Sequence, residues 1–600
     1  MGNLASIRII GKYGSRMGQG LSSSTQTIRV SDNMVRTIPD VVRNSYTFSD
    51  GVGMLSNDLA DQVRDIMGLK RTPSAFQIRY KGAKGVVSVS PPSLGFQQTL
   101  ALRPSMVKFE GHEDQCNLEI LSFSKAMKCY LNRQAITILS CLGIQDCIFM
   151  NMLEDMLKIL DQCITETQSA LNILDYTMHQ KIFTILQCGF QLEKDPYLMS
   201  YIVAIRDCLL VGLQTKARIL VQQGLNLIGI MDETESIPPG HIFFQWYEGD
   251  EIKQLPPNQK VVVYRSPSLH PGDIRVLTTY DNPKLHHLVD VVVFPSLGKR
   301  PHPNEMSGGD LDGDIYSVIW DPKLVPSKNY RPMDYSAPSP SSTISSITIK
   351  DVMNFFVDYM KNDNLGVIAN AHVVFADSKP EGACSSECLK LAELHSTAVD
   401  FAKTGIPATL PDHLRVYTYP DFMENKHYTS YESAKILGKI YRRSKKPSRI
   451  LDKKFTSIQP DAALQVPGWK EYQDDAYEVF TWYGKELWEI MCRFEVFDEG
   501  QLLSNHVINL SRKHSNSKQQ GKNIKEHLCK HVSDIQKRYE DEFWSEFEKK
   551  DLSFEVMKKA SAWYQVAYEK GSFLSFPWIV SDVLCHIKQK TCFEEGFCIL

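Results

Sequence analysis

Two strand-rich blocks, separated by about a hundred residues of helical pattern, constrain this fold more than any other feature. The first block covers residues 48–122, where Phe76–Tyr80 alternates apolar and polar side chains as a half-buried strand does. The second block covers residues 226–321, where short apolar runs such as Val291–Phe294 are bounded by Pro and Gly. We therefore expect an α+β protein in which a helical connector joins two β domains.

The other segments follow from the same kinds of pattern. Apolar side chains between the two blocks recur at helical spacing, as in Leu153, Met156, Leu157 and Leu160. Near the N-terminus, Ser6–Ile10 and Thr27–Val30 are typical of strands. The predicted division is an N-terminal segment 1–47, a first β domain 48–122, a helical connector 123–225, a second β domain 226–325, a Pro/Ser-rich loop 326–347 and a mostly helical region 348–600.

Composition narrows the classes of function. The chain is 43% apolar and 23% charged, with a net charge of −3, so wholesale binding of polyanions is excluded while a local basic channel is not. The fourteen cysteines have no CxxC spacing, which predicts free thiols in a reducing, intracellular compartment, either cytoplasm or nucleus. No run of about 18 apolar residues is present, and we expect no membrane span.

The run Asp310-Leu311-Asp312-Gly313-Asp314 is the strongest chemical signal. Carboxylates at alternate positions share one face if the segment is extended, and Gly313 lets the backbone bend so that they converge. Carboxylates this close raise one another's pKa, a repulsion that a divalent cation removes. All-oxygen ligands select a hard ion such as Mg²⁺ or Ca²⁺ rather than zinc.

Two other interpretations of this run are possible from its residue types. A solvated acidic turn is the commonest fate of such sequences, but apolar strand patterns flank this one on both sides. A calcium loop of the EF-hand type requires Gly at its sixth position and Glu at its twelfth, where this chain has Ile315 and Asp321. From the residues alone, the choice between an acidic turn and a catalytic Mg²⁺ site stays open.

The wider sequence around the run closely resembles the eukaryotic RNA-dependent RNA polymerases of RNA silencing. The resemblance covers about residues 10–585 and rests on many motifs in order, among them Phe48–Gly53, Pro73–Arg79, Arg103–Met106, His270–Arg275, Gly298–Glu305, Ser307–Asp314, Tyr419–Met423, Leu437–Tyr441 and Ser575–Trp578. It implies a pair of double-psi β-barrels, the second carrying the aspartates, joined by a helical connector and followed by a helical head.

The resemblance also implies roles for individual residues. Asp310, Asp312 and Asp314 match the catalytic triplet, which is expected to bind one Mg²⁺ firmly and share a second with the nucleotide. Lys84 and Lys108 match the lysines of the first barrel that face this triplet. Candidates for contacts with template or product phosphates are Arg275, Lys299 and Arg300, while Asp273 either holds Arg275 or lies near the metal.

The implied function is synthesis of complementary RNA from ribonucleoside triphosphates on single-stranded RNA, which gives double-stranded RNA for siRNA production together with small-RNA pathway proteins. The family usually carries a substantial N-terminal part, and only some forty residues precede Phe48 here, so we expect that part to be lacking. The alternative is therefore a truncated, inactive RNA-binding scaffold. A third class, a Ca²⁺-binding structural protein, has the least support.

Overall fold

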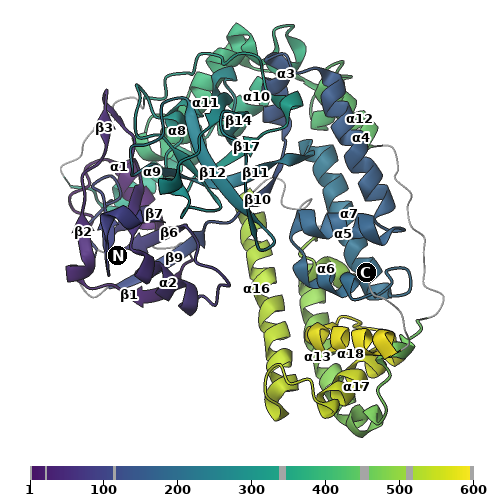
Figure 1. Cartoon of the computed structure of the whole chain (residues 1–600). Coiled ribbons are helices and arrows are strands. Elements are labelled where there is room, and N and C mark those ends of the chain that lie inside the picture. The colour runs from purple at the N-terminus through teal and green to yellow at the C-terminus, as the bar shows by residue number, and fades with distance from the viewer. Residues whose placement is uncertain are drawn as a thin grey trace. The chain divides into compact units, whose positions relative to one another are not determined.

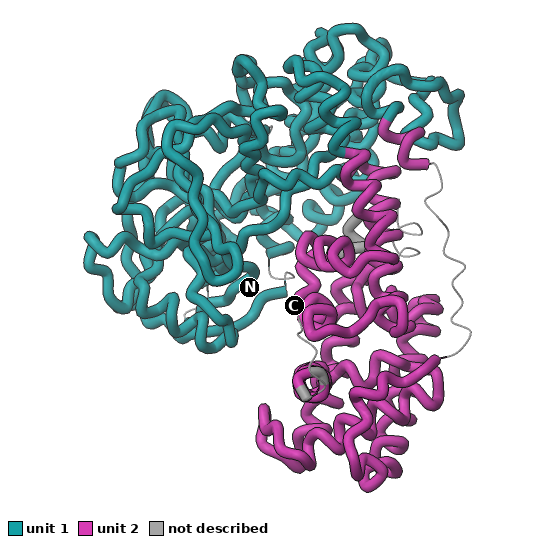
Figure 2. Tube along the Cα trace, turned by 45° about the vertical axis from the view of Figure 1, so that its right-hand side comes forward, with its two compact units in different colours: residues 1–152, 219–439 teal, residues 153–218, 440–600 magenta. Residues whose placement is uncertain are grey.

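The computed structural model describes residues 3–19, 23–111, 116–336, 346–445, 458–507 and 518–594. The chain forms two compact units (Figures 1 and 2). The first unit contains residues 1–152 and 219–439, and the second contains residues 153–218 and 440–600. Both units are therefore discontinuous in the sequence.

The first strand-rich block forms a seven-stranded sheet in the order β1-β9-β6-β7-β5-β8-β2. Its strands are β1 (Thr25–Arg29), β2 (Val35–Thr37), β5 (Val52–Leu55), β6 (Ala75–Tyr80), β7 (Ala83–Val89), β8 (Leu100–Leu102) and β9 (Asn117–Phe123), and β3 (Val42–Arg43) pairs separately with β4 (Tyr46–Thr47). The predicted strands Phe76–Tyr80 and Thr27–Val30 are confirmed as β6 and, in large part, β1. The edge strands β1 and β2 do not pair with each other among the described residues, so this sheet is open.

Two helices replace segments that were expected to be strand or loop. The helix α1 (Ile10–Gln19) overlaps the predicted strand Ser6–Ile10, and α2 (Asn57–Ile66) interrupts the block that was expected to be all β. Leu59, Ala60 and Val63 form the buried stripe of α2, a spacing typical of a helix that packs on a core. The predicted strand at Ser6–Ile10 and the predicted all-β block were therefore wrong. The helical patterns of α1 and α2 are short, and the strand patterns beside them dominated the prediction.

The second strand-rich block closes into a β-barrel. Strand β11 (Leu220–Met231) pairs with β16 (Val291–Phe294) on one side and β17 (Ile315–Ile319) on the other. The pairing continues from β16 through β12 (His241–Glu248), β15 (Arg275–Thr279) and β14 (Lys260–Arg265) back to β17. At the margin, β10 (Met127–Tyr130) pairs with β11 and β13 (Glu251–Gln254) pairs with β12.

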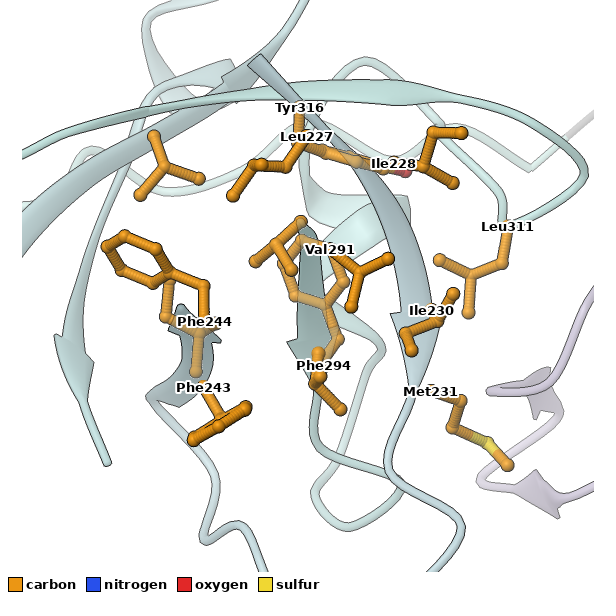
Figure 3. Packing of buried hydrophobic residues seen from close by; sticks show 14 of the residues in the cluster. Leu227, Ile228, Ile230, Met231, Phe243, Phe244, Val291, Phe294, Leu311 and Tyr316 are labelled. Atoms are coloured by element: carbon orange, nitrogen blue, oxygen red, sulfur yellow. The ribbon is translucent and has the colours of Figure 1, made fainter. Parts of the chain in front are cut away.

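The barrel core includes a residue of the aspartate run. Leu311 is 1% exposed and lies among the apolar side chains of β11 and β16 (Figure 3). Its side chain closely approaches Gly229, where an added Cβ would lie 3.1 Å from Leu311 Cδ2. Phe48, Val52, Ala75 and Val86, which come from the first block, pack into the same core and join the two β regions.

Helices and two short strands complete the first unit. They are α3 (Arg133–Cys141), α8 (His302–Glu305), α9 (Ile349–Asn362), α10 (Leu365–Ser378), α11 (Ser386–Thr404), β18 (Thr418–Pro420) and β19 (Thr429–Tyr431). Cys141 at the end of α3 forms a disulfide with Cys384, so the expectation that all cysteines are free thiols was wrong. The two cysteines are 243 positions apart, and only the packing of α3 beside residues 382–384 brings them together.

The second unit is helical in the residues described. It contains most of α4 (Asp146–Gln162) and of α12 (Ile436–Ser444), and all of α5 (Thr167–Thr177), α6 (Gln180–Gln187), α7 (Pro196–Lys216), α13 (Gln473–Phe494), α14 (Glu499–Leu503), α16 (Lys518–Phe543), α17 (Phe554–Lys570) and α18 (Ser581–Glu594). Helix α7 is long and apolar enough to cross a membrane, but 56% of that apolar window is buried, as in a core helix. The predicted connector helices thus share one compact unit with the C-terminal helices.

Candidate active site

The aspartate run lies in a bent loop between α8 and β17, and the bend at Gly313 is the one that the sequence predicted. Leu311 is inserted into the barrel core, and the Tyr316 hydroxyl donates to the Asp310 carbonyl at 2.8 Å. Gly313 has a φ of +127°, a conformation that other residues adopt only with strain. These anchors fix the backbone on both sides of Asp312.

Residues of the first sheet hold the outer side of the loop. Leu311 N–H donates to the Asp50 carbonyl at 2.9 Å, and the Gln77 side-chain amide donates to the Asp312 carbonyl at 3.1 Å. A Cβ added to Gly51 would lie 2.5 Å from Asp312 Cβ, so only glycine allows this approach. The loop is therefore clamped between the closed barrel and the seven-stranded sheet.

Two of the three carboxylates form ion pairs with basic side chains. Lys84 Nζ lies 2.7 Å from Asp312 Oδ2, and Arg265 Nε lies 2.6 Å from Asp314 Oδ2. The Arg265 guanidinium also donates to the Ser307 carbonyl at 3.2 Å. Arg265 thus connects the start of the loop to its last aspartate. The Asp310 carboxylate accepts the Asp312 N–H at 3.2 Å.

The aspartates differ in their acidity. Burial raises the pKa of Asp310 above its ordinary value, and the neighbouring carboxylates Asp312 and Asp314 raise it further. Burial also disfavours the ionised form of Asp312, but Lys84, Lys108 and Lys403 together outweigh this effect, so the pKa of Asp312 is lowered. The loop therefore concentrates negative charge that is incompletely balanced at Asp310.

Lys108, the second predicted lysine, lies at the same site. Its ammonium donates to the Ser105 carbonyl and interacts electrostatically with Asp50, Asp310 and Asp312. Burial lowers the pKa of Lys108, although these carboxylates oppose the effect. The structure thus brings together both predicted lysines and the three aspartates.

The predicted phosphate-binding residues are placed differently. Arg275 Nε lies 3.2 Å from Glu305, and the same guanidinium donates to the Tyr330 carbonyl at 2.8 Å. Arg300 donates to Asn304 and to the Met333 carbonyl. Lys299 is exposed. Because both arginines already bind protein groups, RNA contacts from Arg275, Lys299 and Arg300 remain predictions.

Asp273 neither holds Arg275 nor approaches the aspartates. Its buried carboxylate accepts from Leu269 N–H and His270 N–H, both at 2.9 Å, from Ser307 N–H at 3.0 Å and from the Tyr335 hydroxyl. Burial raises the pKa of Asp273. Its role is to fix the loop before β15 against the start of the aspartate loop, which corrects both sequence-based interpretations.

The chemistry of the three carboxylates fits a hard divalent cation, since all their donors are oxygen and a cation would offset the repulsion that raises the pKa of Asp310. As the side chains stand, however, no group of three His, Cys, Asp or Glu residues in the described part of the chain converges as metal ligands. Lys84 and Arg265 occupy oxygens of Asp312 and Asp314 instead. The three aspartates have the oxygen donors that a divalent cation requires. In this structure Lys84 and Arg265 balance the charge of Asp312 and Asp314.

Several neighbours of the aspartates were missed from the sequence. Arg265 lies opposite Tyr316 in the pairing of β14 with β17, which places it beside Asp314. Arg79 lies directly opposite Lys84 across the β6–β7 hairpin. The two-residue turn Lys81-Gly82 fixes that register, so the sequence carried a signal for Arg79. The position of Arg265 beside Asp314 could be predicted only from the pairing of β14 with β17 in the barrel.

A cavity of about 220 Å³ adjoins Asp310. Its walls include Tyr46, Asp50, Asn304 and Ser336, so they mix aromatic, acidic and uncharged polar side chains. The cavity lies within the first compact unit. It provides space beside the aspartates for a small polar group.

Comparison with known proteins shows which family of proteins this chain is similar to. A model of the family "RNA dependent RNA polymerase" matches residues 1–444, and a model of the head domain of these polymerases matches residues 459–595. The chain is 38% identical to probable RNA-dependent RNA polymerase 1 of Oryza sativa subsp. japonica, covering 98% of this chain and 82% of that protein.

Other relatives are longer. The chain is 38% identical to RNA-dependent RNA polymerase 1 of Arabidopsis thaliana and 30% identical to RNA-dependent RNA polymerase 1 of Schizosaccharomyces pombe, and it spans only 54% and 53% of their lengths. Among solved structures, RNA dependent RNA polymerase QDE-1 from Thielavia terrestris has a TM-score of 0.60 at 18% identity, covering 99% of this chain and 72% of that one. This structural likeness concerns the fold alone.

Proposed function

The chain belongs to the RNA-dependent RNA polymerase family, and we propose that it copies single-stranded RNA into complementary RNA from ribonucleoside triphosphates. The observation that carries the proposal is the clamped loop in which Asp310, Asp312 and Asp314 lie close to Lys84 on β7 and Lys108 in the segment between β8 and β9. The double-stranded product would enter siRNA production and gene silencing.

In the finer fold that we propose, the closed barrel and the seven-stranded sheet are two double-psi β-barrels facing each other across the aspartate loop. The closed pairing of β11 with β16 and β17 supports this for the second barrel. The contacts of Asp50 and Gln77 with the loop support the facing arrangement.

The residues divide the work of nucleotidyl transfer. Mg²⁺ held by Asp310, Asp312 and Asp314 would supply activation of the RNA 3′-hydroxyl and charge balance at the phosphorus. Lys84 and Lys108 act as point cations for the triphosphate oxygens. Leu311 keeps the carboxylates in place, because its burial in the barrel core prevents the loop from turning.

An incorporation assay tests this function. The purified protein is incubated with single-stranded RNA, Mg²⁺ and labelled ribonucleotides, and compared with Asp312→Ala and with Asp358→Ala, which removes an exposed carboxylate on α9. We expect Asp312→Ala to abolish incorporation, by at least about a hundredfold, and Asp358→Ala to retain it. Equal incorporation by wild type and Asp312→Ala would rule out the proposed site.

The second candidate is an RNA-binding scaffold without polymerase activity. It is favoured by the ion pairs of Lys84 and Arg265, which occupy oxygens of Asp312 and Asp314 that a metal ion would need. Tight binding of the RNA template, with no incorporation by wild type under any metal condition, would select this alternative.

A further inference from the structure

A second cavity, of about 380 Å³, lies at the end of α3 and shares no lining residue with the candidate active site. Its walls come from α3, the first residue of α4, α10, the segment 380–382 and residues 435–437, all within the first compact unit. Cys141 lines this cavity, whereas its disulfide partner Cys384 does not. A small molecule that enters the cavity therefore reaches one sulfur of the bond and not the other.

The segment that carries Cys384 is held in place by contacts other than the disulfide. Lys435 Nζ donates to the Ala376 carbonyl at 2.9 Å and also to the Lys379 carbonyl. Cys384 N–H donates to the Glu381 carbonyl at 3.2 Å. Because these hydrogen bonds do not involve sulfur, breaking the S–S bond leaves Cys384 close to its present position.

Cys141 is anchored from the other side by helix α3. The buried residues of this helix are Ala135, Ile136, Ile138 and Leu139. The Cα atoms of Cys141 and Cys384 are 6.6 Å apart. Since both cysteines are held independently of their bond, two free thiols would stay within reach of each other, and the disulfide can open and close without refolding of the chain.

Lys435 also places a positive charge beside the bond. A Cβ added to Gly382 would lie 3.8 Å from Cys141 Cβ and 3.9 Å from Lys435 Nζ, so the cysteine and the ammonium flank the same glycine. A neighbouring ammonium stabilises a thiolate, which is the form of cysteine that attacks or leaves in disulfide exchange. The cavity thus combines access to Cys141 with a cation that favours the chemistry of exchange.

We propose that Cys141 is a site of thiol–disulfide exchange with a low-molecular-weight thiol that enters this cavity. The thiolate of the small molecule attacks Cys141 Sγ, the bond to Cys384 breaks, and Cys384 leaves as a thiolate that takes a proton from water. The product is a mixed disulfide between Cys141 and the small thiol.

A second molecule of thiol completes the reduction. It attacks the sulfur of the bound small molecule, which releases Cys141 as a thiol and the small molecule as its own disulfide. The reverse sequence uses that disulfide as the oxidant. Cys141 then takes up one half of it and releases the other half as a thiol, and Cys384 displaces the bound half to restore the original bond.

Mass spectrometry of the full chain, with reduced and oxidised glutathione as the probe, tests the exchange. In wild type, we expect the disulfide to convert to two thiols as the share of reduced glutathione rises. Cys384→Ser should trap the mixed disulfide, so that oxidised glutathione attaches to Cys141. Cys141→Ser should carry at least about tenfold less glutathione on Cys384 after the same time, because Cys384 does not line the cavity.

Two further variants separate this site from ordinary thiol reactivity. Cys147→Ser removes an exposed free cysteine close to Cys141 in the sequence, and it should leave the exchange as in wild type. In the Cys384→Ser background, Lys435→Gln should slow the attachment of glutathione to Cys141. Lys435→Arg, which keeps the positive charge, should recover part of that rate.

The proposal is overturned if Cys141 and Cys384 remain free thiols in oxidised glutathione, or if their disulfide persists in the folded protein at every ratio of reduced to oxidised glutathione. It is also overturned if glutathione attaches to Cys384 as readily as to Cys141. The wild-type titration decides the first two outcomes even if a variant fails to fold. None of these measurements requires polymerase activity, so they stand apart from the proposed function.

Discussion

At the scale of single residues, Arg265 stands out because one guanidinium holds both ends of the aspartate loop. It pairs with Asp314 at 2.6 Å and donates to the Ser307 carbonyl at 3.2 Å. The two paired side chains are only 25% and 19% exposed, so water screens this pair less than a surface pair. Arg265 therefore contributes to the order of the loop as well as to its charge.

Replacing Arg265 with Gln should loosen the loop. An unpaired and largely buried Asp314 carboxylate costs about 1–3 kcal/mol, so we expect amide hydrogen exchange over residues 309–316 to accelerate by roughly ten- to a hundredfold. The double variant Arg265→Gln/Asp314→Asn should exchange more slowly than the single one, because it leaves no carboxylate at position 314 without its cationic partner.

The matched control is Arg415→Gln, which breaks a surface pair with Asp412 whose members are 55% and 97% exposed. Such pairs contribute at most about 1 kcal/mol, and no change is expected in the loop. Unaltered exchange in Arg265→Gln would contradict the role assigned to Arg265.

The sequence predicted part of the site and could not predict the rest. Asp310, Asp312 and Asp314 stand together in a short run, and the resemblance added Lys84 and Lys108. Arg265 and Lys403 were not predicted, because no motif in the sequence around either residue indicates a role at the site. Each comes close to the aspartates only through tertiary packing. Arg275 and Arg300 were selected for being near in sequence, yet their guanidinium groups bind Glu305 and Asn304.

At the scale of elements, the contact of α1 with α11 depends on one glycine. A Cβ at Gly11 would lie within 2.9 Å of two carbonyl oxygens of α11, whereas a Cβ at Gly14 would meet nothing within 4 Å. Gly11→Ala should therefore displace α1. Gly14→Ala should stabilise the same helix by about 0.5–1 kcal/mol, because alanine has the higher helix propensity.

Hydrogen-exchange protection of α1 measures both effects. We expect protection to fall in Gly11→Ala and to rise in Gly14→Ala. The same sign in both variants would show that helix propensity, rather than the close approach to Ala402, governs this element.

The sequence predicted the type of an element, strand or helix, correctly where its pattern of apolar residues was clear. Strand β6 followed from its alternation of apolar and polar residues, and strand β16 followed from its apolar content. Helices α1 and α2 are only 10 residues long and stand among strand signals, so their short patterns were overridden. The closure of the barrel by pairing of β11 with β17 was not visible in either strand alone.

At the scale of the whole molecule, buried histidines link stability to pH in both units. Burial lowers the pKa to about 4 for His372 and His395 in the first unit and for His179 and His506 in the second. A folded pKa below the unfolded value of about 6.5 contributes stability above pH 6.5 that is lost as pH falls toward 4. Asp195 opposes this, since its pKa is raised to about 6 and its contribution is lost as pH rises through that value.

We expect each of these four histidines to lower the melting temperature as the pH falls from 7.5 to 5, while the buried acids with raised pKa values, Asp195, Asp273 and Asp310 among them, act in the opposite direction. His372→Asn and His506→Asn should each reduce this pH dependence. His427→Asn, which changes an exposed histidine, should leave it as in wild type. Calorimetry at both pH values provides the measurement, and an unchanged slope in both buried variants would contradict the assignment.

The discontinuity of the second unit has a consequence for the order in which the protein is made. Its helices at residues 153–218 leave the ribosome before about 220 residues of the first unit, and their partners at residues 440–600 follow only afterwards. At about 5–20 residues per second, the early helices wait roughly 10–45 s with their apolar faces uncovered. The nascent chain therefore needs protection by chaperones during this interval, and the first unit, although interrupted, is the one that completes first.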